Sequence, residues 1–153
     1  MVSGCASARI VGGVYHSPKG YQVALPGAEW RIADESGADL ELRHRTMPAG
    51  MLVNATCGGG SSPPVLDVLA RRLLLGLVDR ATVERGEVAL NGRNAAHVVA
   101  DGRLQSRSER MRIEAYVVRD DRCVYDFLYV APPAAFEGGR AEFRRLVETF
   151  ATE

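Results

Sequence analysis

The clearest structural signal in the chain is Glu87-Val88-Ala89-Leu90-Asn91-Gly92-Arg93-Asn94-Ala95-Ala96-His97-Val98-Val99-Ala100. Asn91-Gly92 is the strongest short-range signal for a β-hairpin, because both turn residues must take positive φ. The sequence therefore predicts two antiparallel strands, Glu87–Leu90 and Arg93–Ala100. Asp101-Gly102 repeats the signal and predicts a second turn, followed by a long extended stretch that ends near Val118.

Strand patterns continue on both sides of this hairpin. Short apolar or alternating runs bounded by glycine and proline are typical of strands. Such runs are found at Gly12–His16, Tyr21–Leu25, Trp30–Ile32, Leu40–Arg43, Met51–Cys57 and Cys123–Val130. The glycine run Gly58-Gly59-Gly60 lacks the lysine-threonine ending of a phosphate-binding loop and indicates a plain loop.

Two segments have apolar residues at helical spacing. The first runs from about Pro63 to Val78, and its apolar stripe consists of Leu66, Leu69, Ala70, Leu73, Leu74 and Leu77. The second begins at Phe136 and carries Phe143, Leu146, Val147 and Phe150, with Arg140 and Arg144 outside the stripe. The order of elements predicts an α+β fold, an antiparallel β-sheet flanked by two main helices.

Length and composition indicate one domain. The chain has 153 residues, 46% of them hydrophobic, and its 19 basic and 19 acidic residues cancel. No linker or repeat divides it, so we expect a single domain over residues 14–153 behind a flexible amino-terminal segment, residues 1–13. Balanced charge gives no electrostatic reason to bind nucleic acid, and none is predicted.

The amino terminus suggests how the protein is held in the cell. Val2-Ser3-Gly4-Cys5 resembles a bacterial lipobox, which predicts lipidation of Cys5 and a lipoprotein of the cell envelope. The resemblance implies an apolar signal segment ahead of Val2 in the full gene. Ala6 stands where an aspartate commonly retains lipoproteins at the inner membrane, which favours the periplasmic side of the outer membrane. The alternative is an ordinary unstructured amino terminus.

Cys57 and Cys123 remain once Cys5 is lipidated. An even number of cysteines in an oxidising compartment favours a disulfide, and both residues lie in predicted strands. The alternative is two separate buried thiols. No Cys-x-x-Cys is present and the three histidines show no ligand spacing, so neither a metal nor a cofactor is predicted.

One stretch carries a family resemblance. It runs Tyr15-His16-Ser17-Pro18-Lys19-Gly20-Tyr21-Gln22-Val23-Ala24-Leu25-Pro26 and leads to Trp30. This pattern, with the closing segment Phe136 to Phe150, resembles the PsbP-like family, which includes the PsbP subunit of photosystem II and envelope lipoproteins of the DcrB type. The resemblance implies an antiparallel sheet flanked by helices and a role in binding or assembly without catalysis. No residues here match the metal-contacting positions of the photosynthetic members.

Two features of the sequence are candidate chemical sites. Asp126 shares a strand face with apolar neighbours, so burial could raise its pKa and make it an acid or base. The structural alternative is a carboxylate held by arginine, with Arg43, Arg45 or Arg112 as partner. The possible ligand or partner face consists of Tyr116, Tyr125 and Tyr129, for which core packing under the last helix is the alternative.

These observations lead to three hypotheses of different kinds. The first is a lipid-anchored interaction or assembly module of the cell envelope, without catalytic activity, that binds an unknown envelope protein. The second is a periplasmic binding domain for a small apolar or aromatic ligand. The third is an enzyme built on Asp126 or on Cys57 and Cys123 as a redox pair, and we do not expect it.

Overall fold

The computed structural model describes residues 7–58, 65–105 and 107–153, and these form two antiparallel sheets and two helices. The large sheet has the strand order β4 (Trp30–Ala33), β5 (Leu40–His44), β6 (Gly50–Cys57), β10 (Cys123–Ala131), β9 (Arg110–Arg119), β8 (Arg93–Leu104) and β7 (Leu77–Leu90). The small sheet has the order β1 (Arg9–Val11), β2 (Val14–Ser17), β3 (Tyr21–Ala24) and β11 (Ala151–Thr152). The helices are α1 (Leu66–Leu73) and α2 (Pro133–Glu148). The predicted α+β architecture is confirmed.

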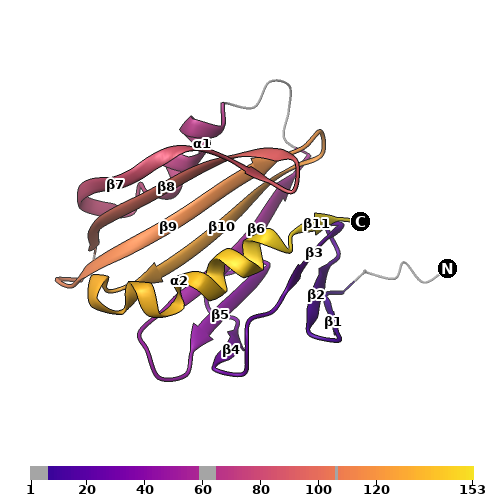
Figure 1. Cartoon of the computed structure of the whole chain (residues 1–153), viewed down its shortest axis with the longest axis horizontal. Coiled ribbons are helices and arrows are strands. Elements are labelled where there is room, and N and C mark those ends of the chain that lie inside the picture. Colours follow the sequence, from indigo (N-terminus) through magenta and orange to yellow (C-terminus); the bar gives the residue numbers. More distant parts are fainter. Residues whose placement is uncertain (1–6, 59–64, 106) are drawn as a thin grey trace.

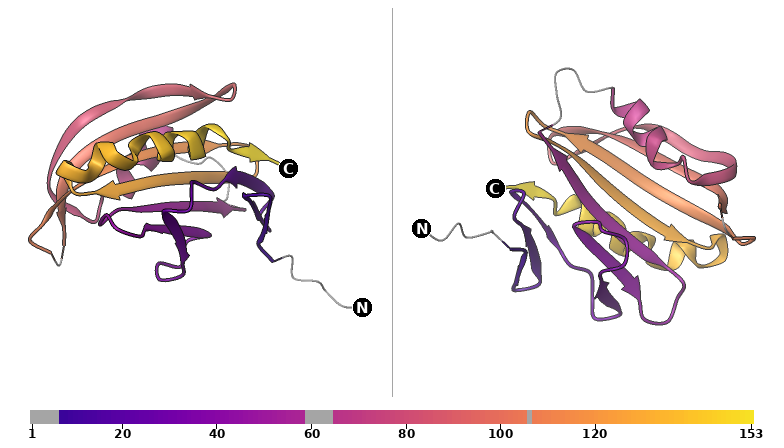
Figure 2. Two further views of the ribbon diagram at one scale, coloured as in Figure 1. Left: turned by 60° about the horizontal axis from the view of Figure 1, so that its bottom comes forward. Right: turned by 180° about the vertical axis from the view of Figure 1, so that it is seen from behind.

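The two helices lie on opposite faces of the large sheet (Figures 1 and 2). Side chains along β10 alternate between these faces, so that Tyr125, Phe127 and Tyr129 point toward α2 and are fully buried. Val124, Leu128 and Val130 point to the α1 side and stay partly exposed. None of the helices in the described residues is long and apolar enough to cross a membrane.

Helix α2 packs closely on the sheet because of one glycine. A Cβ atom at Gly139 would lie 2.6 Å from Tyr129 Oη, so no larger residue fits there without movement. Tyr129 Oη donates a hydrogen bond to the carbonyl oxygen of Phe136 at 2.8 Å. The helix also buries Phe143, Leu146 and Val147, which confirms its predicted apolar stripe.

The Asn91-Gly92 hairpin is confirmed, since these residues have φ angles of 49° and 78° and join β7 to β8. The predicted turn at Asp101-Gly102 is wrong, because both residues lie inside β8. Asp101 accepts two hydrogen bonds from Arg112 of β9, at 2.6 and 2.9 Å, which holds it in the ladder. Gly102 allows close approach of β7: a Cβ there would lie 3.0 Å from the carbonyl oxygen of Val78.

The first helix is shorter than predicted. It ends at Leu73, and β7 begins at Leu77, where the apolar periodicity had suggested continued helix. Leu74 and Leu77 still pack in the same apolar cluster as Ala70, but from a turn and a strand. Apolar spacing alone cannot distinguish a continued helix from a turn followed by a strand. Leu77 is in a strand because it pairs with Leu104 of β8.

Part of the segment expected to be flexible forms a strand. Arg9–Val11 forms β1, inside the segment expected to be flexible, and pairs with β2. Gly12 and Gly13 both have positive φ and form the two-residue turn that this hairpin requires. Cys5 lies outside the described residues.

The small sheet is attached to β6 through Asp39. Its carboxylate accepts hydrogen bonds from Tyr21 Oη at 2.8 Å and from the backbone N–H of Ala55 at 2.9 Å. Tyr15 and Tyr21, which flank the proline-glycine turn, are both buried beside each other. The aromatic residues of this turn therefore serve the core.

The predicted disulfide is present. Strands β6 and β10 pair antiparallel, so the last residue of β6, Cys57, faces the first residue of β10, Cys123. Their Cα atoms lie 4.1 Å apart and the bond joins residues separated by 66 positions. It therefore closes a long loop that contains α1 and the β7–β8 hairpin.

We expect loss of this bond to destabilise the domain, because a cross-link over a loop of this length restricts the unfolded chain by about 4 kcal/mol. Reduction, or the Cys57→Ser/Cys123→Ser double substitution, should lower the melting temperature by about 10 °C in thermal unfolding. Reductant should leave the double variant unchanged. Two thiols titrated in the unreduced, denatured protein lacking Cys5 would contradict the bond.

Candidate functional site

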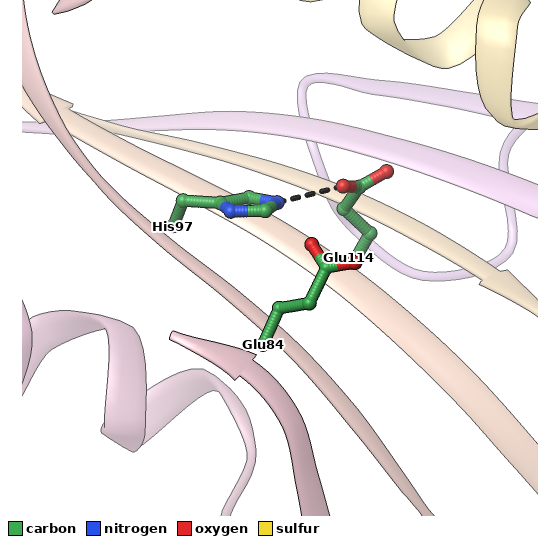
Figure 3. A group of neighbouring side chains, drawn as sticks. All are labelled: Glu84, His97 and Glu114. Carbon is green, nitrogen blue, oxygen red and sulfur yellow. Dashed lines mark hydrogen bonds and ion pairs between the residues drawn. The ribbon is translucent and has the colours of Figure 1, made fainter. Parts of the chain in front are cut away.

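A buried ionic cluster lies between α2 and the sheet, centred on Glu114 of β9 (Figure 3). Glu114 is fully buried, and its carboxylate accepts hydrogen bonds from Arg140 at 3.1 and 3.0 Å and from Arg144 at 3.2 Å. His97 Nε2 lies 2.7 Å from Glu114 Oε2, and the His97 ring stacks on Tyr116. Glu84 of β7 accepts a hydrogen bond from Arg140 at 3.2 Å.

The charge of Glu114 is strongly stabilised. Burial raises the pKa of its carboxyl, but the hydrogen bonds from His97 and Arg140 outweigh burial and lower the pKa to about 2. Its hydrogen bond in turn raises the pKa of the Arg140 guanidinium. A permanently ionised, fully paired carboxylate has no proton to exchange near neutral pH, so Glu114 is suited to fixing α2 on β9.

Glu84, His97 and Glu114 bring one ligand atom each within 4.8 Å of one another, which is a spacing that a metal ion could bridge (Figure 3). Two guanidinium groups already hold Glu114, however, and a cation would meet their charge at close range. The electrostatics therefore favour an ionic clamp over a metal centre. His97 is thus a structural residue, held by Glu114 and stacked on Tyr116.

This cluster is not among the sites predicted above, although the sequence contains a signal for it. Glu114 shares its strand face with Tyr116 and Val118, both core residues, so a carboxylate interrupts a buried face. Arg140 and Arg144 are one helical turn apart and were placed on the solvent side of α2. A buried carboxylate opposite a pair of arginines is the pattern that would have identified it.

The three tyrosines predicted as a possible ligand face lie in the core. Tyr125 and Tyr129 are 0% exposed and Tyr116 is 6% exposed. Tyr129 stacks on Phe143 with ring centroids 5.5 Å apart, and Tyr125 packs on Phe150 at 4.8 Å. The structure therefore supports the alternative, core packing under α2.

Asp126 points to the opposite face, among Val124 and Leu128 of its own strand. Burial raises the pKa of its carboxyl to about 6. The arginine partners expected from the sequence are wrong, because they are held elsewhere: Arg43 pairs with Glu41, Arg112 with Asp101, and Arg45 donates to the carbonyl oxygen of Ala28. Asp126 is thus a partly desolvated carboxyl on the less covered face of the sheet.

That less covered face carries a groove at one end of the large sheet. It has a volume of about 550 Å³, and its walls come from β5, β6, β9 and β10. Half-exposed apolar residues form much of its lining, namely Met47, Leu52, Leu104, Met111 and Val130. Arg31, Arg43 and Arg107 lie at its margin together with Glu41 and Glu109. A groove of this kind suits an apolar ligand with a polar end.

A second groove, of about 580 Å³, lies on the same side of the sheet between α1 and β7. Its floor is apolar, with Ala70, Leu74, Ala96 and Val98, and its rim carries Arg71, Arg72, Arg80 and Arg85. Helix α1, which has 8 residues, forms one wall of this groove (its position is seen in Figure 2). A smaller pocket of about 360 Å³ lies elsewhere, between residues 24–27 and the end of α2, so the two larger grooves are those on the α1 side of the sheet.

The architecture is that of a PsbP-like α+β protein. Several solved structures resemble it. The cyanobacterial PsbP (CyanoP) of Synechocystis sp. PCC 6803 has a TM-score of 0.68 and 11% identity, with 100% of this chain and 98% of that chain covered. LpqN of Mycobacterium tuberculosis, described as involved in cell envelope biogenesis, has a TM-score of 0.70 and 12% identity over 87% of this chain and 83% of that one. A Pseudomonas aeruginosa protein of unknown function, described as a putative regulator, has a TM-score of 0.58 and 13% identity, with coverage of 82% and 99%.

No protein-family model and no curated protein matches the chain. At these identities the likeness of the solved structures concerns the fold alone. It confirms the resemblance found in the sequence, and function must be inferred from the surface of this protein.

The raised pKa of Asp126 predicts a stability that depends on pH. The carboxyl titrates near its usual 3.8 when unfolded and at about 6 when folded, so stability falls as the pH rises from about 4 to 6. Asp126→Asn should therefore stabilise the protein at pH 7 by about 1–3 kcal/mol and remove this loss. Urea unfolding at pH 4.5 and 7 measures both. An Asp126→Asn protein that is less stable than the wild type at pH 7 would show that the carboxylate has a partner.

Proposed function

We propose that the protein is a lipid-anchored interaction module of the bacterial cell envelope, without catalytic activity, that presents the α1 side of its sheet to an envelope partner. The observation that carries this proposal is the incomplete cover of that side, where two grooves lie beside partly exposed apolar residues. Surfaces that are concave, partly apolar and rimmed by charge are typical of binding sites.

Three further observations support the proposal. The Cys57–Cys123 disulfide suits a compartment outside the cytoplasm, where such bonds persist. The buried charge at Glu114 is neutralised by fixed partners and leaves no poised acid–base pair. LpqN, a structural neighbour, is described as involved in cell envelope biogenesis, which is consistent with an envelope role here.

The anchor is tested by fractionation of cells that express the full gene. Acylation of Cys5 should bring the protein into the detergent phase and the outer-membrane fraction, because lipid chains partition out of water. Cys5→Ser should move it to the aqueous phase. A Cys5→Ser protein that stays equally membrane-bound, or an upstream stop codon with no other start, would count against lipidation.

A small apolar ligand is the second candidate function, now in the groove at the end of the sheet instead of on the tyrosines. The half-exposed side chains of Leu52, Met111 and Val130 in this groove favour it. The proposed ligand has an apolar body on these residues and a polar end near the marginal arginines.

This candidate predicts that an apolar fluorescent probe, anilinonaphthalene sulfonate, binds the folded protein with increased emission. Met111→Arg should weaken binding about tenfold, because it places a charge where the apolar body would lie. The control is Val11→Arg, a substitution at a residue 60% exposed on β1, which should bind as the wild type. Equal affinity of the wild type and Met111→Arg would reject this groove as the site.

A further inference from the structure

Strand β7 presents a long open edge. It is the last strand on its side of the large sheet, and within the described residues its pairing partner is β8 alone. All residues from Asp79 to Ala89 are exposed. An edge strand of this kind carries a row of backbone N–H and C=O groups that can pair with another extended segment.

Arginines gather along this edge. Arg80 and Arg85 of β7 and Arg71 and Arg72 of α1 line the groove between the two elements, with Asp67 as its one carboxylate. Asp67 is already shared, since Arg85 donates to it at 2.9 and 2.6 Å and Arg71 lies 3.3 Å away. In the part of the chain that is described, Arg72 and Arg80 form no ion pair. The groove lining thus has an excess of positive charge. Of the three carboxylates on β7 itself, Asp79 pairs with Arg103, Glu84 pairs with Arg140, and Glu87 lies outside the groove lining.

We propose that this edge binds an extended acidic segment of a partner protein, which adds to the sheet as a strand next to β7. The segment's backbone pairs with the β7 edge, and its carboxylates bind the guanidinium groups of Arg72 and Arg80. This inference rests on the proposed function and names the chemistry of the partner. Strand addition of this type takes affinity from backbone hydrogen bonds and specificity from alternate side chains.

A peptide fits these features better than a membrane does. A lipid head group can satisfy the arginines but cannot pair with a strand edge.

A second copy of the chain fits less well. Twofold pairing of β7 with itself would place both arginine grooves on the same face of the joined sheet. Like charges would then meet across the new interface.

The test uses the full, purified chain and synthetic peptides of about eight residues, a usual strand length. One peptide alternates glutamate with valine, and its matched control has lysine in place of glutamate. The acidic peptide should bind in isothermal titration and the basic one should not. N-methylation of the acidic peptide at either its odd or its even positions blocks one edge, and one of the two patterns should weaken binding at least about tenfold.

Variants locate the site. Arg72→Glu and Arg80→Glu should each weaken binding of the acidic peptide about five- to tenfold, since both change an attraction into a repulsion. Arg9→Glu, an equally exposed arginine on β1, should bind as the wild type. All four proteins should keep the same melting temperature within a few degrees.

The proposal would be overturned if the acidic and basic peptides bound alike or if both methylated peptides kept full affinity. It would also be overturned if Arg9→Glu weakened binding as much as Arg80→Glu does, or if sedimentation showed a dimer that pairs through β7. Anionic vesicles of phosphatidylglycerol that bind in place of the peptide would also overturn it. These measurements need no envelope, so their failure is separate from a failure of the fractionation that tests the anchor.

Discussion

The register between β6 and β10 is the constraint on which the rest of the structure depends. These two strands join the first half of the large sheet to the second, and the Cys57–Cys123 bond ties their ends. The residue pairs run without a break from Cys57 and Cys123 to Gly50 and Val130, so side chains on both strands alternate between the two faces in step. A shift of one residue would turn Tyr125, Phe127 and Tyr129 away from α2 and expose the core. The disulfide therefore stabilises the domain and also favours the one register that buries these aromatic residues.

Because of this register, the two faces of the large sheet are covered to different extents. The α2 face receives a helix of 16 residues and a continuous aromatic core, closed by the ionic contact of Glu114 with Arg140 and Arg144. The other face receives a helix of 8 residues, which cannot cover seven strands. Apolar residues of β6 and β10 on that side remain partly exposed. The first face serves stability, and the second is the face that we propose for recognition.

Much of the fold could be predicted from local signals. The Asn91-Gly92 hairpin, the strands Met51–Cys57 and Cys123–Val130, and the stripe of the last helix all depend on neighbouring residues, and all are confirmed. Features that depend on distant partners were predicted poorly. Asp101-Gly102 looks like a turn until Arg112 on the next strand is in place, and the leucine spacing near Leu77 cannot show that Leu104 will pair with it.

The same limit applied to the candidate sites. The disulfide could be predicted because the argument depends on the number of cysteines and not on their positions in the fold. The tyrosines were considered a ligand face because the sequence does not tell which helix will cover a strand, and α2 buries all three. The ionic cluster joins β7, β8, β9 and α2, four elements spread between Glu84 and Arg144, so no local pattern contains it.

The placement of charge gives the last indication of how this protein works. The 19 basic and 19 acidic residues of the chain cancel in number, but they are not distributed evenly over the structure. Three carboxylates, Glu84, Glu114 and Glu137, pair with Arg140. The groove between α1 and β7 has four arginines and one carboxylate, Asp67, which pairs with Arg71 and Arg85. Mutual repulsion of cations opposes such clustering, so it weakens the free protein slightly and is relieved when an anion binds. A surface with unmatched charge beside an unpaired strand is better suited to holding another molecule than to changing one.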